Sequence, residues 1–150
     1  MIKNLKTLIN KNYFLFIVSN QPDYVLERTT KEELLTIEAD FKAFMLKNNI
    51  HFKGIYYCHH HPNGAIPELA VTCKCRKPSP FFIEKAVEKY DIDVSNAWMV
   101  GDCGLDVMTG KNAGIKTILQ MNEHSLKNMG EIKPDFMTES LDETVERILS

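Results

Sequence analysis

Three of the four cysteines and three of the five histidines fall in one short stretch of the chain. Two close pairs stand out in it, Cys58-x-His60 and Cys73-x-Cys75. Three thiolates and one imidazole are a ligand set that suits closed tetrahedral zinc, and a closed site keeps no position for water. We therefore predict a structural zinc loop over about residues 58–78.

The choice of the histidine ligand has rivals on either side. His61 precedes Pro62, which restricts its backbone, and His59 would point away from Cys58 if the strand geometry continues. We therefore favour His60. The alternative is a set of free cysteines beside solvated histidines. Disulfides are disfavoured, because a bridge across the second cysteine pair would be strained and the expected compartment is reducing.

Two further segments carry groups that suit phosphate. Arg76 and Lys77 follow the second cysteine pair directly, so Lys77 would neutralise phosphate charge and Arg76 would supply a bidentate fork. Ser19, Asn20 and Gln21 follow an apolar run, and a hydroxyl and amides at a strand end can hold phosphoryl oxygens. Taken alone, the first segment is typical of a protein surface and the second of a turn.

Asp102 and Asp106 follow another apolar run. Mg²⁺ takes one or two protein carboxylates together with substrate oxygens, so Asp102 is the candidate magnesium ligand. The alternative for Asp102 is an N-cap on the following helix. Asp106 either supports the metal ligand Asp102 without binding the metal itself or lies on the helix surface. Cys103 is expected to be a small buried or half-buried residue.

The composition is that of an ordinary soluble globular domain, with 44% hydrophobic and 25% charged residues. A length of 150 residues most simply makes one domain. The net charge of -2, without a basic and aromatic-rich patch, argues against a nucleic-acid partner. No apolar stretch approaches the ~20 residues of a membrane span, and the run at 13–18 lacks the cleavage site of a signal peptide. We therefore expect a cytoplasmic protein.

Helical and strand patterns alternate along the chain. We predict helices at 2–9, 30–45, 79–90, 105–113 and 140–149, and strands at 13–18, 54–58, 97–100, 115–119 and 135–137. Thr30 and Glu33 form a capping box, followed by an apolar stripe from Leu34 to Met45. The alternation predicts an α/β fold with a parallel sheet. Ligands bind beyond the carboxyl ends of such strands, so the candidate groups should meet at one rim.

Together these residues resemble the haloacid dehalogenase superfamily of phosphotransferases. The segment Ser19-Asn20-Gln21 is similar to its second motif, Lys77 to its third, and Gly101-Asp102-x-x-x-Asp106 to its fourth. The zinc loop that runs into Arg-Lys-Pro resembles one zinc-bearing branch, which contains heptose 1,7-bisphosphate phosphatases and histidinol-phosphate phosphatases. The resemblance covers about residues 5–119.

The resemblance implies a three-layer Rossmann-like fold and a Mg²⁺-dependent phosphatase with structural zinc. Its substrate would be a small phosphorylated sugar, most simply a heptose bisphosphate, with histidinol phosphate as the alternative. Ser19 and Lys77 would bind the transferring phosphate, with Asn20 and Gln21 beside them. Arg76 would orient the substrate or stabilise developing charge.

Two departures from the family pattern stand out. The family carries its nucleophilic Asp and its acid/base Asp in an Asp-x-Asp-Gly motif on a central first strand, whereas no Asp precedes Asp23 here. The branch also carries Ala-Arg-Gly where this chain has Val25-Leu26-Glu27. We therefore expect an N-terminally truncated domain with little or no activity alone. Its two half-sheets would have open edges for a partner strand, and a non-catalytic phospho-ligand-binding protein is the alternative.

Overall fold

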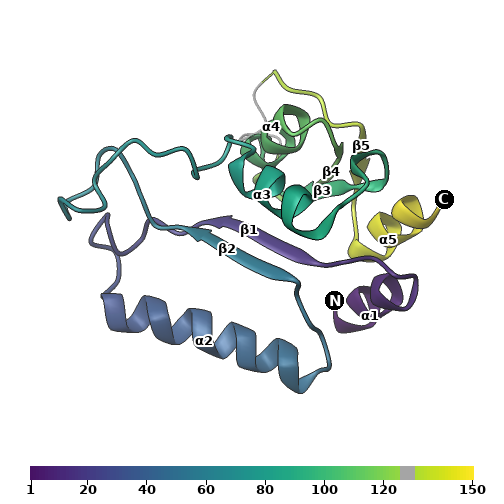
Figure 1. Cartoon of the computed structure of the whole chain (residues 1–150), viewed down its shortest axis with the longest axis horizontal. Helices are drawn as coiled ribbons and strands as arrows, with labels where there is room; N and C mark the ends of the chain where they lie inside the picture. Colours follow the sequence, from purple (N-terminus) through teal and green to yellow (C-terminus); the bar gives the residue numbers. More distant parts are fainter. Residues whose placement is uncertain (126–130) are drawn as a thin grey trace. The chain divides into compact units, whose positions relative to one another are not determined.

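The computed structural model describes residues 1–125 and 131–150. The chain divides into two compact units, residues 2–76 and residues 77–150 together with Met1. We call them the N-terminal unit and the C-terminal unit and describe each by itself (Figure 1). The expectation that the whole chain is a single domain stays a prediction. No helix in the described part of the chain is both long and apolar enough to cross a membrane.

The N-terminal unit contains one pair of parallel strands. Its elements are α1 (Ile2–Asn10), β1 (Phe16–Asn20), α2 (Lys31–Lys47) and β2 (Gly54–Cys58). In the register of the pair, Phe16 lies opposite Gly54 and Asn20 opposite Cys58. The carboxyl ends of β1 and β2 therefore meet, so the phosphate-binding candidates of β1 lie beside the first residue of the predicted zinc loop.

The strand β1 begins three residues later than predicted and is half-buried along its length rather than fully buried. The reason for the late start lies at the end of α1. Asn12 takes a left-handed conformation (φ 63), and the amide of Tyr13 donates to the carbonyl of Leu8 at 3.0 Å. This turn closes the helix, so the chain becomes extended only after it.

The helix α2 begins with the predicted capping box. The hydroxyl of Thr30 accepts from the amide of Glu33 at 3.1 Å, and the Glu33 carboxylate accepts from the Thr30 amide at 2.9 Å. Only part of the predicted apolar stripe is buried: Leu34 and Met45 are, whereas Ile37 is 62% and Phe44 50% exposed. At 100° per residue these two lie about 60–80° around the helix from Leu34, on the flank of the buried face.

The C-terminal unit is built on three parallel strands. Its elements are α3 (Phe81–Tyr90), a 3₁₀ turn (Val94–Asn96), β3 (Trp98–Gly101), α4 (Gly104–Asn112), β4 (Lys116–Gln120), β5 (Phe136–Thr138) and α5 (Leu141–Leu149). The strand order is β3-β4-β5. Val107 of α4, Ile118 and Leu119 of β4 and Val145 of α5 are buried in its core. The predicted α/β fold with parallel strands is confirmed, and the described strands form two sheets.

A carboxylate ties the elements of the C-terminal unit together. Asp135, directly before β5, accepts from the amide and the hydroxyl of Thr117 at 2.8 and 2.7 Å. Its other oxygen accepts from the ammonium of Lys111 on α4 at 2.5 Å. The Lys111 hydrogen bond, assisted by those from Thr117, lowers the pKa of Asp135.

Replacing this carboxylate should remove a pH-dependent part of the stability. The pKa of Asp135 in the folded chain lies below the value of about 3.9 in an unfolded one, so its stabilisation is present above about pH 4 and is lost as the pH falls through the folded pKa. Asp135→Asn should lower the free energy of unfolding at pH 7 by about 1 kcal/mol, allowing for solvent screening. Urea unfolding at pH 7 and near pH 3 measures this.

Asp40→Asn, on an exposed position of α2, is the matched control and should be nearly neutral at both pH values. A difference between Asp135→Asn and the parent chain that stays constant down to the lower pH would contradict the role assigned to the charge.

Candidate metal and phosphate sites

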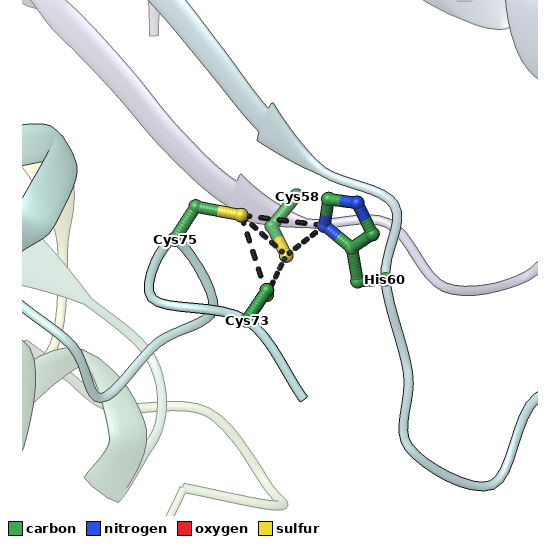
Figure 2. Close-up of side chains that lie close together, drawn as sticks. All are labelled: Cys58, His60, Cys73 and Cys75. Carbon is green, nitrogen blue, oxygen red and sulfur yellow. Dashed lines mark hydrogen bonds between the residues drawn. The ribbon is translucent and has the colours of Figure 1, made fainter. Parts of the chain in front are cut away.

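The four predicted zinc ligands gather in the N-terminal unit. Cys58 ends β2, His60 follows it, and Cys73 and Cys75 return from the far end of the loop (Figure 2). The Sγ of Cys75 lies 3.3 Å from that of Cys73, 3.4 Å from that of Cys58 and 3.4 Å from Nδ1 of His60. Zn–S and Zn–N bonds of about 2.3 and 2.0 Å place tetrahedral thiolate and imidazole ligand atoms roughly 3.5–3.8 Å apart, slightly farther than these atoms lie. The donor set and its spacing therefore fit a zinc ion.

Burial and the close approach of the thiols shift the pKa values in this cluster in different directions. Burial and the neighbouring thiols raise the pKa of Cys75 to about 12, and burial also raises the pKa of Cys58. Burial acts in the same direction on Cys73, but hydrogen bonds from the other two thiols and from nearby amides outweigh it and lower its pKa. Three thiolates at this spacing need a cation to compensate for their charge, which is the role a bound metal would fill.

Both rival histidines are engaged outside the cluster. Nε2 of His59 lies 2.7 Å from a carboxylate oxygen of Glu38 on α2, and its ring stacks on Tyr57 with centroids 6.1 Å apart. Nδ1 of His61 accepts from the amide of Asn63 at 3.2 Å. Of the three consecutive histidines, only His60 belongs to the four-residue group.

Arg76 is fixed to the same loop. Its guanidinium donates from Nη1 to the backbone carbonyl of His60 at 2.9 Å. The arginine predicted to meet the substrate is thus held by the backbone of a candidate metal ligand.

Removing one cluster thiol should abolish metal binding. Cys75→Ser replaces a soft ligand by a hydroxyl, and we expect the bound zinc to fall from about one ion per chain to well below half. Elemental analysis of the purified protein, or a chromophoric chelator assay, measures it. Cys103→Ser is the control with a thiol removed outside the cluster. Equal zinc contents in the two variants would contradict the assignment.

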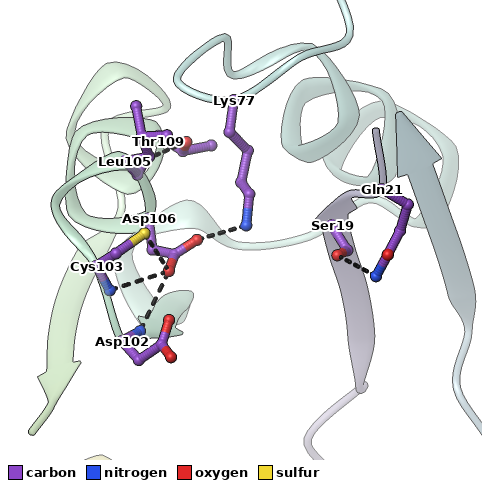
Figure 3. A network of polar contacts seen from close by, with 8 residues as sticks. All are labelled: Ser19, Gln21, Lys77, Asp102, Cys103, Leu105, Asp106 and Thr109. Atoms are coloured by element: carbon purple, nitrogen blue, oxygen red, sulfur yellow. Dashed lines mark hydrogen bonds and ion pairs between the residues drawn. The ribbon is translucent and has the colours of Figure 1, made fainter. Parts of the chain in front are cut away.

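In the C-terminal unit, Lys77 and Asp106 form a buried ion pair. The Lys77 Nζ lies 2.5 Å from Oδ1 of Asp106, with the two side chains 13% and 6% exposed. The other oxygen of Asp106 accepts from the amides of Asp102 and Cys103 at 3.1 and 3.3 Å (Figure 3). A Cβ at Gly101 would come within 2.3 Å of this carboxylate, so only glycine leaves room for it.

These contacts decide between the alternatives for the two aspartates. Cys103, and not Asp102, occupies the N-cap of α4, and Asp106 completes the cap from the third helical position. The N-cap interpretation of Asp102 is therefore wrong, as is the surface interpretation of Asp106, which is 5% exposed. Cys103 is half-buried, and its thiol donates to Asp106 at 3.2 Å. The sequence did not predict that Lys77 pairs with Asp106. The capping role of Asp106 could have been predicted, because Cys103 and Asp106 have the spacing of an N-cap and its capping-box residue.

Asp102 remains the carboxylate able to meet a cation. It is exposed, and one of its oxygens accepts from the side-chain amide of Asn122 at 3.1 Å. Asp106 is committed to Lys77 and to two amides, and the soft sulfur of Cys103 does not suit Mg²⁺. A single hard carboxylate at a strand end fits a Mg²⁺ ion that keeps its other positions for water and substrate oxygens.

The segment Ser19-Asn20-Gln21 lies at the end of β1 in the N-terminal unit. Ser19 and Asn20 are the last residues of β1, and the Gln21 side-chain amide donates to the Ser19 hydroxyl at 3.1 Å (Figure 3). The Gln21 backbone amide continues the ladder by donating to the carbonyl of Cys58 at 2.8 Å. Since Lys77 and Asp102 belong to the other unit, the predicted common rim stays a prediction.

Breaking the buried ion pair should be costly. Asp106→Ala leaves the Lys77 ammonium without this carboxylate in a buried position, and we expect a loss of roughly 3 kcal/mol in the free energy of unfolding. Asp102→Ala, at an exposed neighbouring position, should change it by less than about 0.5 kcal/mol. Chemical denaturation of the two variants compares them, and similar losses would argue against a special role for the pair.

Comparison with known proteins places the chain. The HAD-hydrolase-like family model matches residues 74–144. A D-glycero-beta-D-manno-heptose-1,7-bisphosphate 7-phosphatase of Yersinia pestis is 30% identical over 142 residues, which cover 94% of this chain and 76% of the relative. A D-glycero-alpha-D-manno-heptose-1,7-bisphosphate 7-phosphatase of Photorhabdus laumondii is 32% identical over 114 residues, which cover 76% of this chain and 62% of the relative.

Solved structures agree on the fold. The D,D-heptose 1,7-bisphosphate phosphatase of B. bronchiseptica, complexed with magnesium and phosphate, matches with a TM-score of 0.80 at 20% identity, covering 99% of this chain and 80% of that one. A HAD-like phosphatase of Mesorhizobium loti matches with a TM-score of 0.78 at 20% identity, covering 99% and 71%. The chain is a haloacid dehalogenase-like hydrolase. Within that superfamily it belongs to the family of the heptose-1,7-bisphosphate 7-phosphatases.

Proposed function

We propose that this chain carries the phosphate-binding and metal-binding parts of a Mg²⁺-dependent phosphatase acting on a heptose 1,7-bisphosphate. The observation that carries the proposal is the group at the end of β3, where the buried Asp106 pairs with Lys77 and accepts from the backbone amide of Asp102, whose own carboxylate is exposed. Sequence similarity to heptose bisphosphate phosphatases over nearly the whole chain supports the choice of substrate. The free thiols suit a reducing compartment such as the cytoplasm.

Each candidate residue has a part in this proposal. Lys77 and the Ser19 hydroxyl hold the transferring phosphate, with Asn20 and Gln21 shaping the strand end. Arg76 orients the rest of the substrate, and Asp102 holds Mg²⁺. When bound, Mg²⁺ neutralises charge on the phosphoryl oxygens. Phosphoryl transfer depends mainly on positioning and electrostatic stabilisation, which are the tasks these side chains are suited to.

Zinc has a structural part. We propose that it is bound by Cys58, His60, Cys73 and Cys75, and that it orders the loop leading to Arg76 and Lys77. The ligand spacing and the Arg76 contact with the His60 carbonyl support this role.

The family's nucleophilic aspartate has no counterpart among the residues of this chain. Among the 150 residues no Asp precedes Asp23, so no carboxylate matches the family's Asp-x-Asp motif ahead of Ser19. We infer that the chain by itself binds phosphate esters but turns them over poorly, and that a further strand carrying the motif would complete the site. The same observation favours the second candidate function, a non-catalytic zinc protein that binds phosphorylated ligands or a partner strand.

Binding and turnover of one substrate test this proposal. We expect heptose 1,7-bisphosphate and Mg²⁺ to bind in calorimetric titrations. Lys77→Ala should weaken substrate binding at least about tenfold, because a charge-assisted hydrogen bond to phosphate is lost. Lys74→Ala, an exposed lysine in the same loop, is the control. Phosphate release should not exceed that of Asp102→Asn.

The outcomes separate the two candidates and the inference of poor turnover. Phosphate release well above that of Asp102→Asn would overturn the inference that the 150 residues lack an essential group. A chain that binds neither the bisphosphate nor inorganic phosphate would overturn both candidate functions as ligand-binding sites.

A further inference from the structure

One valine joins the loop after β1 to the zinc loop. Val25 lies in the irregular segment between β1 and α2 and yet is completely buried. A Cβ added at Gly64 would come within 2.3 Å of its Cγ2, so the valine packs directly against the glycine backbone. The amide of Ala65 also donates to the carbonyl of Val25 at 2.7 Å. We call these contacts the Val25 clasp.

The segment that carries the valine is internally bonded. The amide of Leu26 donates to the carbonyl of Pro22 at 2.9 Å, and that of Arg28 to the carbonyl of Asp23 at 2.8 Å. Residues 22–28 therefore form a compact turn that should move as one piece when its single buried side chain is displaced.

On the other side, the clasp is close to the metal ligands. The amide of Gly64 donates to the carbonyl of His61 at 3.0 Å, and the amide of His61 donates to the carbonyl of Leu69 at 3.1 Å. His61 directly follows His60, a member of the Cys/His cluster. Fixing His60 on a metal thus fixes the start of the turn against which Val25 packs.

An open surface cavity of about 570 Å³ lies where the two loops meet within the N-terminal unit. Tyr24, Glu27 and Arg28 line it from the first loop, the start of α2 forms another wall, and Ile66 contributes from the zinc loop. The cavity is therefore shaped by two loops that the Val25 clasp holds together.

We propose that Val25 is a positioning residue that couples metal occupancy of the Cys/His cluster to the placement of residues 22–28, and so to the shape of this cavity. The proposal rests on the cluster holding zinc, and it does not rest on phosphatase activity. Because coupling between two sites is reciprocal, weakening the clasp must also weaken zinc binding.

Hydrogen exchange of the full chain tests the coupling. With zinc bound, the amides of Leu26, Arg28 and Ala65 should be protected, and removal of the metal with a chelator should speed their exchange at least about tenfold. Peptides from α5 in the C-terminal unit should be unaffected, and added zinc should restore protection. Unchanged exchange in residues 22–28 on metal removal would overturn the proposal.

Three variants test the contact itself. Gly64→Ala adds the methyl group that meets Val25, and Val25→Ala removes the methyl groups that it meets. Each alone should speed exchange in residues 22–28 in the zinc-bound protein. The double variant Val25→Ala with Gly64→Ala should have an exchange rate closer to that of the parent chain than Gly64→Ala alone. Val25→Ala makes room for the methyl group that Gly64→Ala adds.

Zinc titrations of the same variants measure the zinc affinity. A valine that only stabilised the fold would not change this affinity. Val25→Ala should still bind one zinc ion at saturation, with an affinity lowered by up to the factor by which zinc slows exchange. Val71→Ala, an exposed valine in the zinc loop, is the control and should leave both quantities unchanged. The coupling would be overturned if Val25→Ala and Gly64→Ala had additive effects on exchange in residues 22–28. An unchanged zinc affinity in Val25→Ala would also overturn it.

Discussion

The close approach of three thiols and one imidazole is the constraint on which the loop after β2 depends. Between β2 and α3 the chain forms no helix and no strand for more than twenty residues, and so it has few backbone hydrogen bonds of its own. Residues 58–60 and 73–75 of this segment meet where three sulfurs and one imidazole nitrogen lie within 4.8 Å of one another. A metal ion bound by these four residues would crosslink the two parts of the segment. Small metal-binding segments become ordered in this way without a hydrophobic core.

The C-terminal unit contains a buried charge, the carboxylate of Asp106, that also needs compensation. Asp106 is buried, but its charge is compensated by Lys77 and by two backbone amides at the start of α4. Gly101 makes this possible, since any side chain there would occupy the space of the carboxylate. Asp102 is thereby left exposed. The Gly-Asp sequence at the end of β3 thus separates two acids by environment, one buried as a support and one open to ligands.

Local signals predicted most of the fold. The Thr30 and Glu33 capping box could be read directly, and so could the alternation of helices and strands, because each depends on residues a few positions apart. The start of β1 could not, since an apolar run does not reveal that Asn12 takes a left-handed conformation. The burial of Val25 in a loop depends on a glycine 39 positions away, and no pattern within a short window contains it.

The candidate site divides in the same way. The four cluster residues could be chosen from ligand chemistry and spacing, and the structure brings their side chains together. The pairing of His59 with Glu38, and that of Lys77 with Asp106, join segments 21 and 29 residues apart. Such contacts depend on how the elements pack, so the sequence could single out these residues but could not predict which of them pair.

The contact between Asp135 and Thr117 has a consequence for strand register. β5 has three residues, too few to define its alignment on β4 by backbone bonds alone. The Asp135 carboxylate accepts from the Thr117 amide, just as a further strand residue would, and so adds one rung ahead of the strand. A slip by one residue would break this rung and would exchange the faces of β5, bringing the exposed Met137 inward and the buried Thr138 outward. One side chain outside the strand therefore selects which face of β5 meets the core.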